Sequence, residues 1–191
     1  VICLETEERE KMSLVTNSVK KMFIQKGLVT YHGGIMRDGI DLLTKDRDIE
    51  LCGVQCRTTA NMVPKRMTPI GQTQECKVKV TISHIPYRGV SETYPNPEHP
   101  PLVINFVKEL GYNTDFVIPL EHNHSSIFLK ANNKYEIEFT TTTNLDLFSY
   151  ATCDASYQAT DSFDVQFNKK HFDNRYYSPV KCLFYKEHYT T

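Results

Sequence analysis

The sequence contains no tryptophan, and it carries no excess of charge of either sign. Its 22 lysines and arginines nearly balance its 23 aspartates and glutamates, which gives a formal net charge of -1 at pH 7. Proteins that hold nucleic acid or an anionic membrane mainly by charge need a basic excess. The composition therefore disfavours both partners, although a local basic patch can exist within a neutral total.

Long apolar runs are also missing from the sequence. Because no stretch is long enough to cross a bilayer as a helix, we expect no membrane span. The 191 residues suffice to bury a substantial core. We expect a single domain over 1–191, with a possible division into a helix-plus-hairpin unit over 1–60 and a β-rich body over 74–191.

The most informative pattern is an alternation of apolar and polar residues that begins at Cys76. It recurs over residues 76–83, 135–139, 163–167 and 180–184. Alternation gives each segment one apolar and one polar face, which is typical of strands in antiparallel sheets. The number and spacing of these segments predict an antiparallel β-sandwich of immunoglobulin-like texture. Leu102–Leu110 fits either a buried strand or a short helix.

The N-terminal part has a different period. Apolar residues recur at spacings of three and four in Met12, Val15, Val19 and Met22. Such a stripe predicts an amphipathic helix from Thr6 to Lys26, which Gly27 would end. With this helix packed on the sheet, the chain would be mainly β and α+β overall.

A β-hairpin is expected after the helix. Its arms would be Gly39–Leu43 and Ile49–Arg57, and Thr44–Asp48 would form the turn. The apolar positions change register across Gly53, which predicts a β-bulge there.

The two arms carry Gly39-Ile40-Asp41 and Val54-Gln55-Cys56-Arg57. Following a helix, this order resembles the core motif of the restriction-endonuclease-like superfamily. The resemblance implies metal-dependent phosphodiester hydrolysis, with Asp41 as a Mg²⁺ ligand, Gln55 at the second motif position and Arg57 in place of the family's lysine. Arginine is bulkier and stays protonated, so it departs from the pattern. The alternative is a plain hairpin with a solvated aspartate and arginine.

The cysteines are even in number and permit three disulfides, in any of 15 connectivities. The candidates are Cys3, Cys52, Cys56, Cys76, Cys153 and Cys182. Cys52 and Cys56 lie too far apart along one extended strand to bond each other easily, whereas Cys153 and Cys182 are plausible partners. Alternatively, all six are reduced and act as small apolar residues. A zinc site is less favoured, because structural zinc usually uses more closely spaced cysteine pairs.

Asn123-His124-Ser125 is a glycosylation acceptor in a polar stretch between expected strands. Together with the cysteines it favours an extracellular or secretory-pathway location, and an intracellular location is the alternative. His122 and His124 flank Asn123 and could bind a metal from one face, or be simply exposed.

The sequence shows neither a nucleophile turn with a Ser-His-Asp set nor a glycine loop for phosphate. We therefore expect a non-enzymatic recognition module, without a cofactor, that binds another protein through loops or a sheet face. One alternative is the Mg²⁺-dependent nuclease. Another is a β-sandwich transcription factor that holds DNA through Lys169, Lys170 and Arg175, with reduced cysteines.

Overall fold

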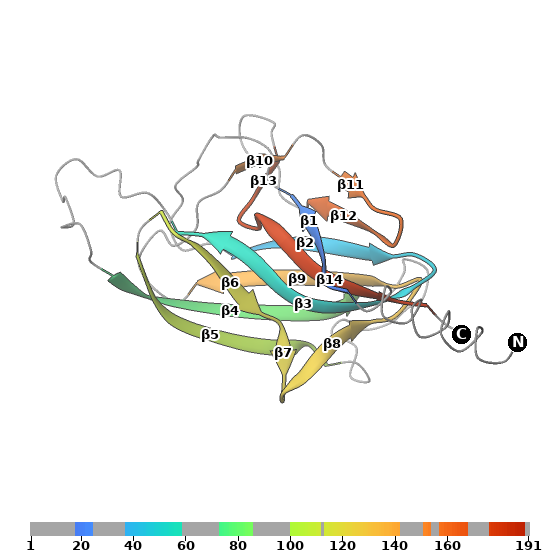
Figure 1. Ribbon diagram of the computed structural model, residues 1–191, viewed down its shortest axis with the longest axis horizontal. Coiled ribbons are helices and arrows are strands. Elements are labelled where there is room, and N and C mark those ends of the chain that lie inside the picture. The colour runs from blue at the N-terminus through green and yellow to red at the C-terminus, as the bar shows by residue number, and fades with distance from the viewer. Residues whose placement is uncertain are drawn as a thin grey trace, which may run out of the picture.

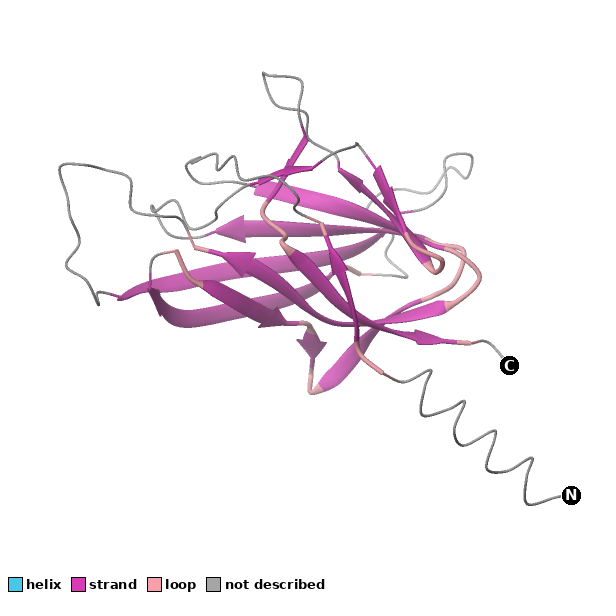
Figure 2. Ribbon diagram, turned by 45° about the horizontal axis from the view of Figure 1, so that its top comes forward, coloured by secondary structure: helices cyan, strands magenta, loops and turns pink. Residues whose placement is uncertain are grey.

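A computed structural model describes residues 18–24, 37–58, 73–85, 100–111, 113–141, 151–153, 157–167 and 176–189. Within these ranges all regular structure is β-strand (Figure 2). Every strand pairing is antiparallel. The prediction of a mainly antiparallel β fold is confirmed. The described residues include no helix with the length and apolarity to cross a membrane.

The first of two six-stranded sheets is built around β3 (Asp48–Arg57) (Figure 1). Its order is β1 (Lys20–Phe23), β14 (Cys182–His188), β3, β8 (Ser125–Leu129) and β7 (Glu121–His122). The sixth strand, β6 (Asp115–Pro119), also pairs with β3.

The second sheet has β2 (Arg37–Thr44) and β9 (Lys134–Thr141) at its centre. Its order is β11 (Tyr157–Ala159), β12 (Phe163–Phe167), β2, β9, β4 (Thr73–Ile85) and β5 (Leu102–Gly111). A separate pair joins β10 (Ala151–Cys153) to β13 (Tyr176–Ser178).

The two sheets share one hydrophobic core. Phe106 of β5 stacks on Phe116 of β6, with 5.8 Å between ring centroids. Phe163 of β12 meets Tyr185 of β14 edge to face at 4.8 Å. Each pair joins one sheet to the other, and all four side chains belong to the same apolar cluster or pack against it. Aromatic pairs of this geometry add to the stabilisation from burial.

The alternation in the sequence has its structural counterpart in burial. On β4, Cys76, Val78 and Val80 are buried, whereas Lys77 and Lys79 are exposed. The ambiguous segment Leu102–Leu110 is a strand, because it pairs with β4 over ten consecutive residues.

The predicted N-terminal helix is wrong at its C-terminal end. Lys20–Phe23 forms β1 and pairs with β14. Met22 and Ile24 are buried while Lys21 and Phe23 are exposed, so the period here is two rather than 3.6. Residues 6–17 and 25–26 of the expected helix lie outside the described residues.

The predicted hairpin is also wrong, although both of its strands exist. β2 pairs with β12 and β9 in the second sheet, and β3 pairs with β14, β6 and β8 in the first. Residues 45–47 therefore carry the chain from one sheet to the other. Both strands are central in their sheets, and each finds hydrogen-bonding partners on two sides without the other.

The irregularity predicted at Gly53 is confirmed. Phe184 pairs with Gly53 but Tyr185 pairs with Leu51, which leaves Cys52 as the extra residue of a bulge. A Cβ atom at Gly53 would lie 3.1 Å from Cγ1 of Val117 and 3.8 Å from the Phe184 ring. The glycine thus leaves room for the side chains of Val117 and Phe184 on the neighbouring strands.

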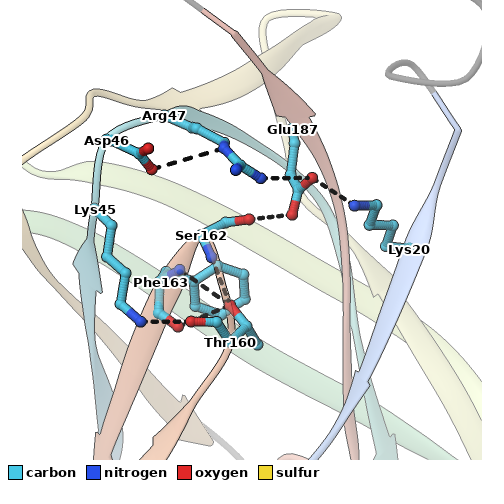
Figure 3. A network of polar contacts seen from close by, with 8 residues as sticks. All are labelled: Lys20, Lys45, Asp46, Arg47, Thr160, Ser162, Phe163 and Glu187. Atoms are coloured by element: carbon cyan, nitrogen blue, oxygen red, sulfur yellow. Dashed lines mark hydrogen bonds and ion pairs between the residues drawn. The ribbon is translucent and has the colours of Figure 1, made fainter. Parts of the chain in front are cut away.

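A buried carboxylate ties the sheets together (Figure 3). Glu187 of β14 accepts hydrogen bonds from Lys20 Nζ at 2.5 Å, from Arg47 Nη1 at 3.5 Å and from the Ser162 hydroxyl. Ser162 precedes β12 of the second sheet. Burial raises the pKa of Glu187, but the hydrogen bonds from Lys20 and Ser162 outweigh it and hold this pKa below its ordinary value.

Candidate functional site

A cleft with a volume of about 420 Å³ lies where strands of both sheets meet a turn. The second sheet contributes Ile82, His84, Leu102 and Tyr135. The first sheet contributes Ile127, Phe128 and Leu129. Pro100 before β5 and the turn residues Lys130 and Asn133 complete the lining. The walls are thus mostly aliphatic and aromatic, as is usual for ligand pockets.

Polar groups converge on one side of the cleft. His84 Nε2 lies 2.8 Å from Asn133 Oδ1, and the His84 ring lies 5.3 Å from the Tyr135 ring, centroid to centroid. The Tyr135 hydroxyl accepts a hydrogen bond from the Lys130 backbone N–H at 2.9 Å. Burial raises the pKa of Tyr135 above its ordinary value. Tyr135 is therefore a neutral phenol at physiological pH and can donate its O–H to a ligand.

The turn that carries Lys130 and Asn133 is held by hydrogen bonds to Thr44 and Asp48. The Thr44 hydroxyl donates to the Lys130 carbonyl oxygen at 2.6 Å, and it accepts from the Asn133 N–H at 3.0 Å. Asp48 accepts from the Ala131 N–H at 2.8 Å and from Lys130 Nζ at 2.7 Å. The hydrogen bond from Lys130 lowers the pKa of Asp48, so this carboxylate stays charged. The rim of the cleft is thereby preorganised.

The chemistry of the lining suits binding. It offers the His84 imidazole, the Asn133 amide, the Tyr135 phenol and Lys130 beside apolar walls, and the described lining includes no carboxylate, thiol or aliphatic hydroxyl. Across the described part of the chain, no three His, Cys, Asp or Glu residues are grouped so that they could hold a metal ion.

The residues of the nuclease-like motif are not brought together. Asp41 lies on β2 in the second sheet, where its buried carboxylate pairs with Lys134 Nζ at 2.7 Å. Gln55 and Arg57 lie on β3 in the first sheet, and Arg57 Nε is 3.6 Å from Asp115 Oδ1. The motif's chemistry requires its acidic and basic residues to be on neighbouring strands of one sheet, and these strands belong to different sheets.

Four of the six cysteines are free thiols: Cys52, Cys56, Cys76 and Cys182. Cys182 is thus a buried free thiol and does not form the disulfide expected with Cys153. Cys3 and the side chain of Cys153 lie outside the described residues. Burial raises the pKa of Cys56 and brings that of Cys76 to about 11, so both behave as small apolar residues.

Asn123 and His124 form the two-residue turn between β7 and β8. Their φ angles are 51° and 61°, as a type I′ hairpin turn requires, and both side chains are exposed. The glycosylation acceptor thus stands at the tip of a hairpin. His122 is half-buried on β7. Lys169, Lys170 and Arg175 lie outside the described residues.

Sequence reasoning missed the residues of the cleft. The available signal was His84, a polar residue two positions after Ile82 on the apolar face of the β4 alternation. The chain matches no protein-family model and no curated protein, so its function is inferred from this geometry.

Proposed function

We propose that the chain is a recognition module of β-sandwich architecture and immunoglobulin-like texture that binds another protein without catalysis. The cleft would receive an apolar side chain of the partner. The observation that carries the proposal is an apolar cleft walled by both sheets, with His84, Asn133 and Tyr135 along one side. A few fixed polar groups beside apolar walls give orientation as well as affinity.

Phe128 supports a protein partner in particular. Its side chain lines the cleft and remains 50% exposed. Its ring lies 5.2 Å from the His188 ring, which restrains it. Large aromatic side chains that are held at a rim but left open to solvent are typical of protein interfaces.

We further propose an extracellular or secretory-pathway location, with a sugar on Asn123. Its support is the placement of the acceptor asparagine at an exposed hairpin tip. The mass of the natively produced protein, measured with and without thiol alkylation, tests this. Added sugar mass that disappears in Asn123→Gln would support the location, and an unmodified chain with six free thiols would overturn it.

Binding in the cleft is tested with defined side-chain analogues. We would titrate the isotopically labelled protein with N-acetyl-phenylalaninamide and N-acetyl-leucinamide and follow the amide and methyl signals by NMR. N-acetyl-glycinamide is the control ligand. Saturable shifts confined to Ile82, Leu102, Ile127 and Tyr135 are expected for the first two ligands only. Shifts that are equal for all three, or that lie outside the cleft, would overturn the proposal.

A matched pair of variants sharpens this test. Tyr135→Phe removes the hydroxyl beside the cleft, whereas Tyr157→Phe removes a hydroxyl from an exposed tyrosine on β11. The first change should weaken analogue binding several-fold, because one polar group of the cleft is lost. The second should leave it unchanged.

A further inference from the structure

The strand β5 forms an edge of the second sheet (Figure 1). Its first residue, Leu102, lines the cleft. Among the described strands it pairs only with β4, in one unbroken register of ten residues from Leu102 to Gly111. The other side of such a strand presents a row of backbone N–H and C=O groups that another strand can pair with. Proteins usually interrupt such edges with bulges, prolines or inward-pointing charges.

One half of β5 carries an inward-pointing charge of this kind. Lys108 pairs with Cys76, so it lies on the core-facing side of the strand, and yet it is exposed. A charge in that position opposes the docking of a further strand over residues 108–111. The half from Leu102 to Val107 contains no charged residue, no proline and no shift in register.

The outer face of the open half carries two valines on either side of Asn105, with the cation of Lys79 beside Asn105. Val103 and Val107 are 39% and 59% exposed. Lys79 pairs with Asn105, midway between the two valines, and makes no ion pair with any residue that the structure describes. The neighbouring Lys77 is already paired with Glu75 at 2.5 Å. This surface complements a strand with apolar side chains and one carboxylate.

The open half of β5 also leads into the cleft. Pro100 and Leu102, at the start of this strand, belong to the cleft lining. A strand added along β5 would therefore place a side chain of its inner face beside Leu102, at the cleft opening.

We propose that Leu102–Val107 binds an extended segment of the partner protein by strand addition. The segment alternates apolar side chains and carries a carboxylate that faces Lys79. This inference rests on the proposed function and specifies that the partner binds as an extended strand. Main-chain hydrogen bonds would supply affinity, while Lys79 and the cleft would supply selectivity.

The test uses two blocked eight-residue peptides that alternate valine and threonine. One has a central glutamate and the other a central lysine. Strand addition should slow hydrogen exchange at alternate amides between Leu102 and Val107 when the glutamate peptide is bound, because only every second N–H points to the free edge. Peptide binding without this alternation, or equal affinity for the two peptides, would overturn the proposal.

Three variants complete the design. Lys79→Glu should weaken binding of the glutamate peptide about fivefold and strengthen that of the lysine peptide, as expected for one exposed ion pair. Val107→Lys should reduce the exchange protection, because it removes an apolar contact of the outer face and places a lysine on the edge strand, where it opposes the docking of a further strand. Val117→Lys, at a comparably exposed valine on β6, is the control and should change neither. The exposed positions make all three compatible with folding.

The failure of this inference can be told apart from failure of the proposed function. If the amino-acid amides still bind the cleft but neither peptide protects β5, strand addition is overturned and the cleft stands. If sedimentation shows a dimer that Val107→Lys dissociates, the edge binds a second copy of the chain, and the proposal of a partner segment is overturned.

Discussion

The hydroxyl of Thr44 donates a hydrogen bond to the carbonyl oxygen of Lys130 at 2.6 Å, across 86 positions of the sequence. Thr44 ends β2, and Lys130 begins the turn at the rim of the cleft. The same hydroxyl accepts from the Asn133 N–H, so one side chain fixes both ends of this turn. The shape of the cleft therefore depends on a residue that does not line it.

Thr44→Val tests this dependence. Valine keeps the shape of the side chain but leaves a part-buried N–H and carbonyl without their partner, which costs about 1–3 kcal/mol of unfolding free energy. Urea denaturation measures the loss, and affinity for N-acetyl-phenylalaninamide should fall in parallel. Thr81→Val, on the outer face of β4, is the control. Unchanged affinity in Thr44→Val would show that the turn is held by its other contacts.

Glu187→Gln tests the buried network between the sheets. The amide cannot compensate the charges of Lys20 and Arg47, so we expect a loss of about 1.5–3 kcal/mol in unfolding free energy, the range for hydrogen bonds to charged groups. Denaturation at pH 7 measures it. A neutral effect would mean that the carboxylate's desolvation cancels its interactions.

The same variant makes a prediction about pH. The folded-state pKa of Glu187 lies below its unfolded value, so the carboxylate contributes stability that is fully present above the unfolded pKa of about 4.3. This contribution is lost as the pH falls through the folded pKa. The stability difference between wild type and Glu187→Gln should therefore be constant from pH 7 to about 5 and shrink below about 4.3. A difference that grows on acidification would contradict the assignment.

Three glycine-to-alanine variants should differ in a defined order. A Cβ at Gly39 would lie 2.8 Å from the Ile137 backbone oxygen, whereas one at Gly53 would meet Val117 Cγ1 at 3.1 Å. At Gly111 the nearest atom is the Thr114 hydroxyl at 3.3 Å. A backbone atom held in a sheet can move aside less easily than a side chain can. Gly39→Ala should therefore lower the unfolding free energy the most, by roughly 1–3 kcal/mol, the range typical of overpacking. Thermal unfolding of the three proteins gives the order, and an equal effect at all three would contradict this packing.

The cysteines should differ in their reactivity. Burial raises the pKa of Cys52, Cys56 and Cys76 alike, but Cys52 is partly exposed whereas Cys56 and Cys76 are buried, so the three thiols differ in their access to a reagent. Iodoacetamide at pH 8 should modify Cys52 in the native protein and reach Cys56 and Cys76 only after denaturation. Peptide mass spectrometry identifies the modified cysteines. Protection of Cys56 that persists after denaturation without reductant would reveal a disulfide.

Much of the architecture could be predicted from the sequence, because alternation reports directly on which face of a strand is buried. The segments around Val78, Ile137 and Val165 were recognised in this way. Pairing partners could not be predicted, since alternation is the same whichever strand lies alongside. For this reason β2 and β3 were expected to form a hairpin but belong to different sheets.

The N-terminal strand and the cleft show two further limits of prediction from the sequence. Met22 fits a helical stripe with Val19 and a strand with Ile24 equally well, and only pairing with β14 decides between them. The cleft joins His84, Leu102 and Tyr135 through the pairings of β4 with β5 and β9. Local patterns carry no information about such long-range pairings.

The most direct test of the recognition cleft is a measurement of intermolecular NOEs between N-acetyl-phenylalaninamide and the methyl groups of the protein. We predict NOEs from the ligand ring to Ile82, Leu102 and Ile127, which line the cleft on strands of both sheets. NOEs only to Val117 on β6, or to no methyl group, would contradict the account.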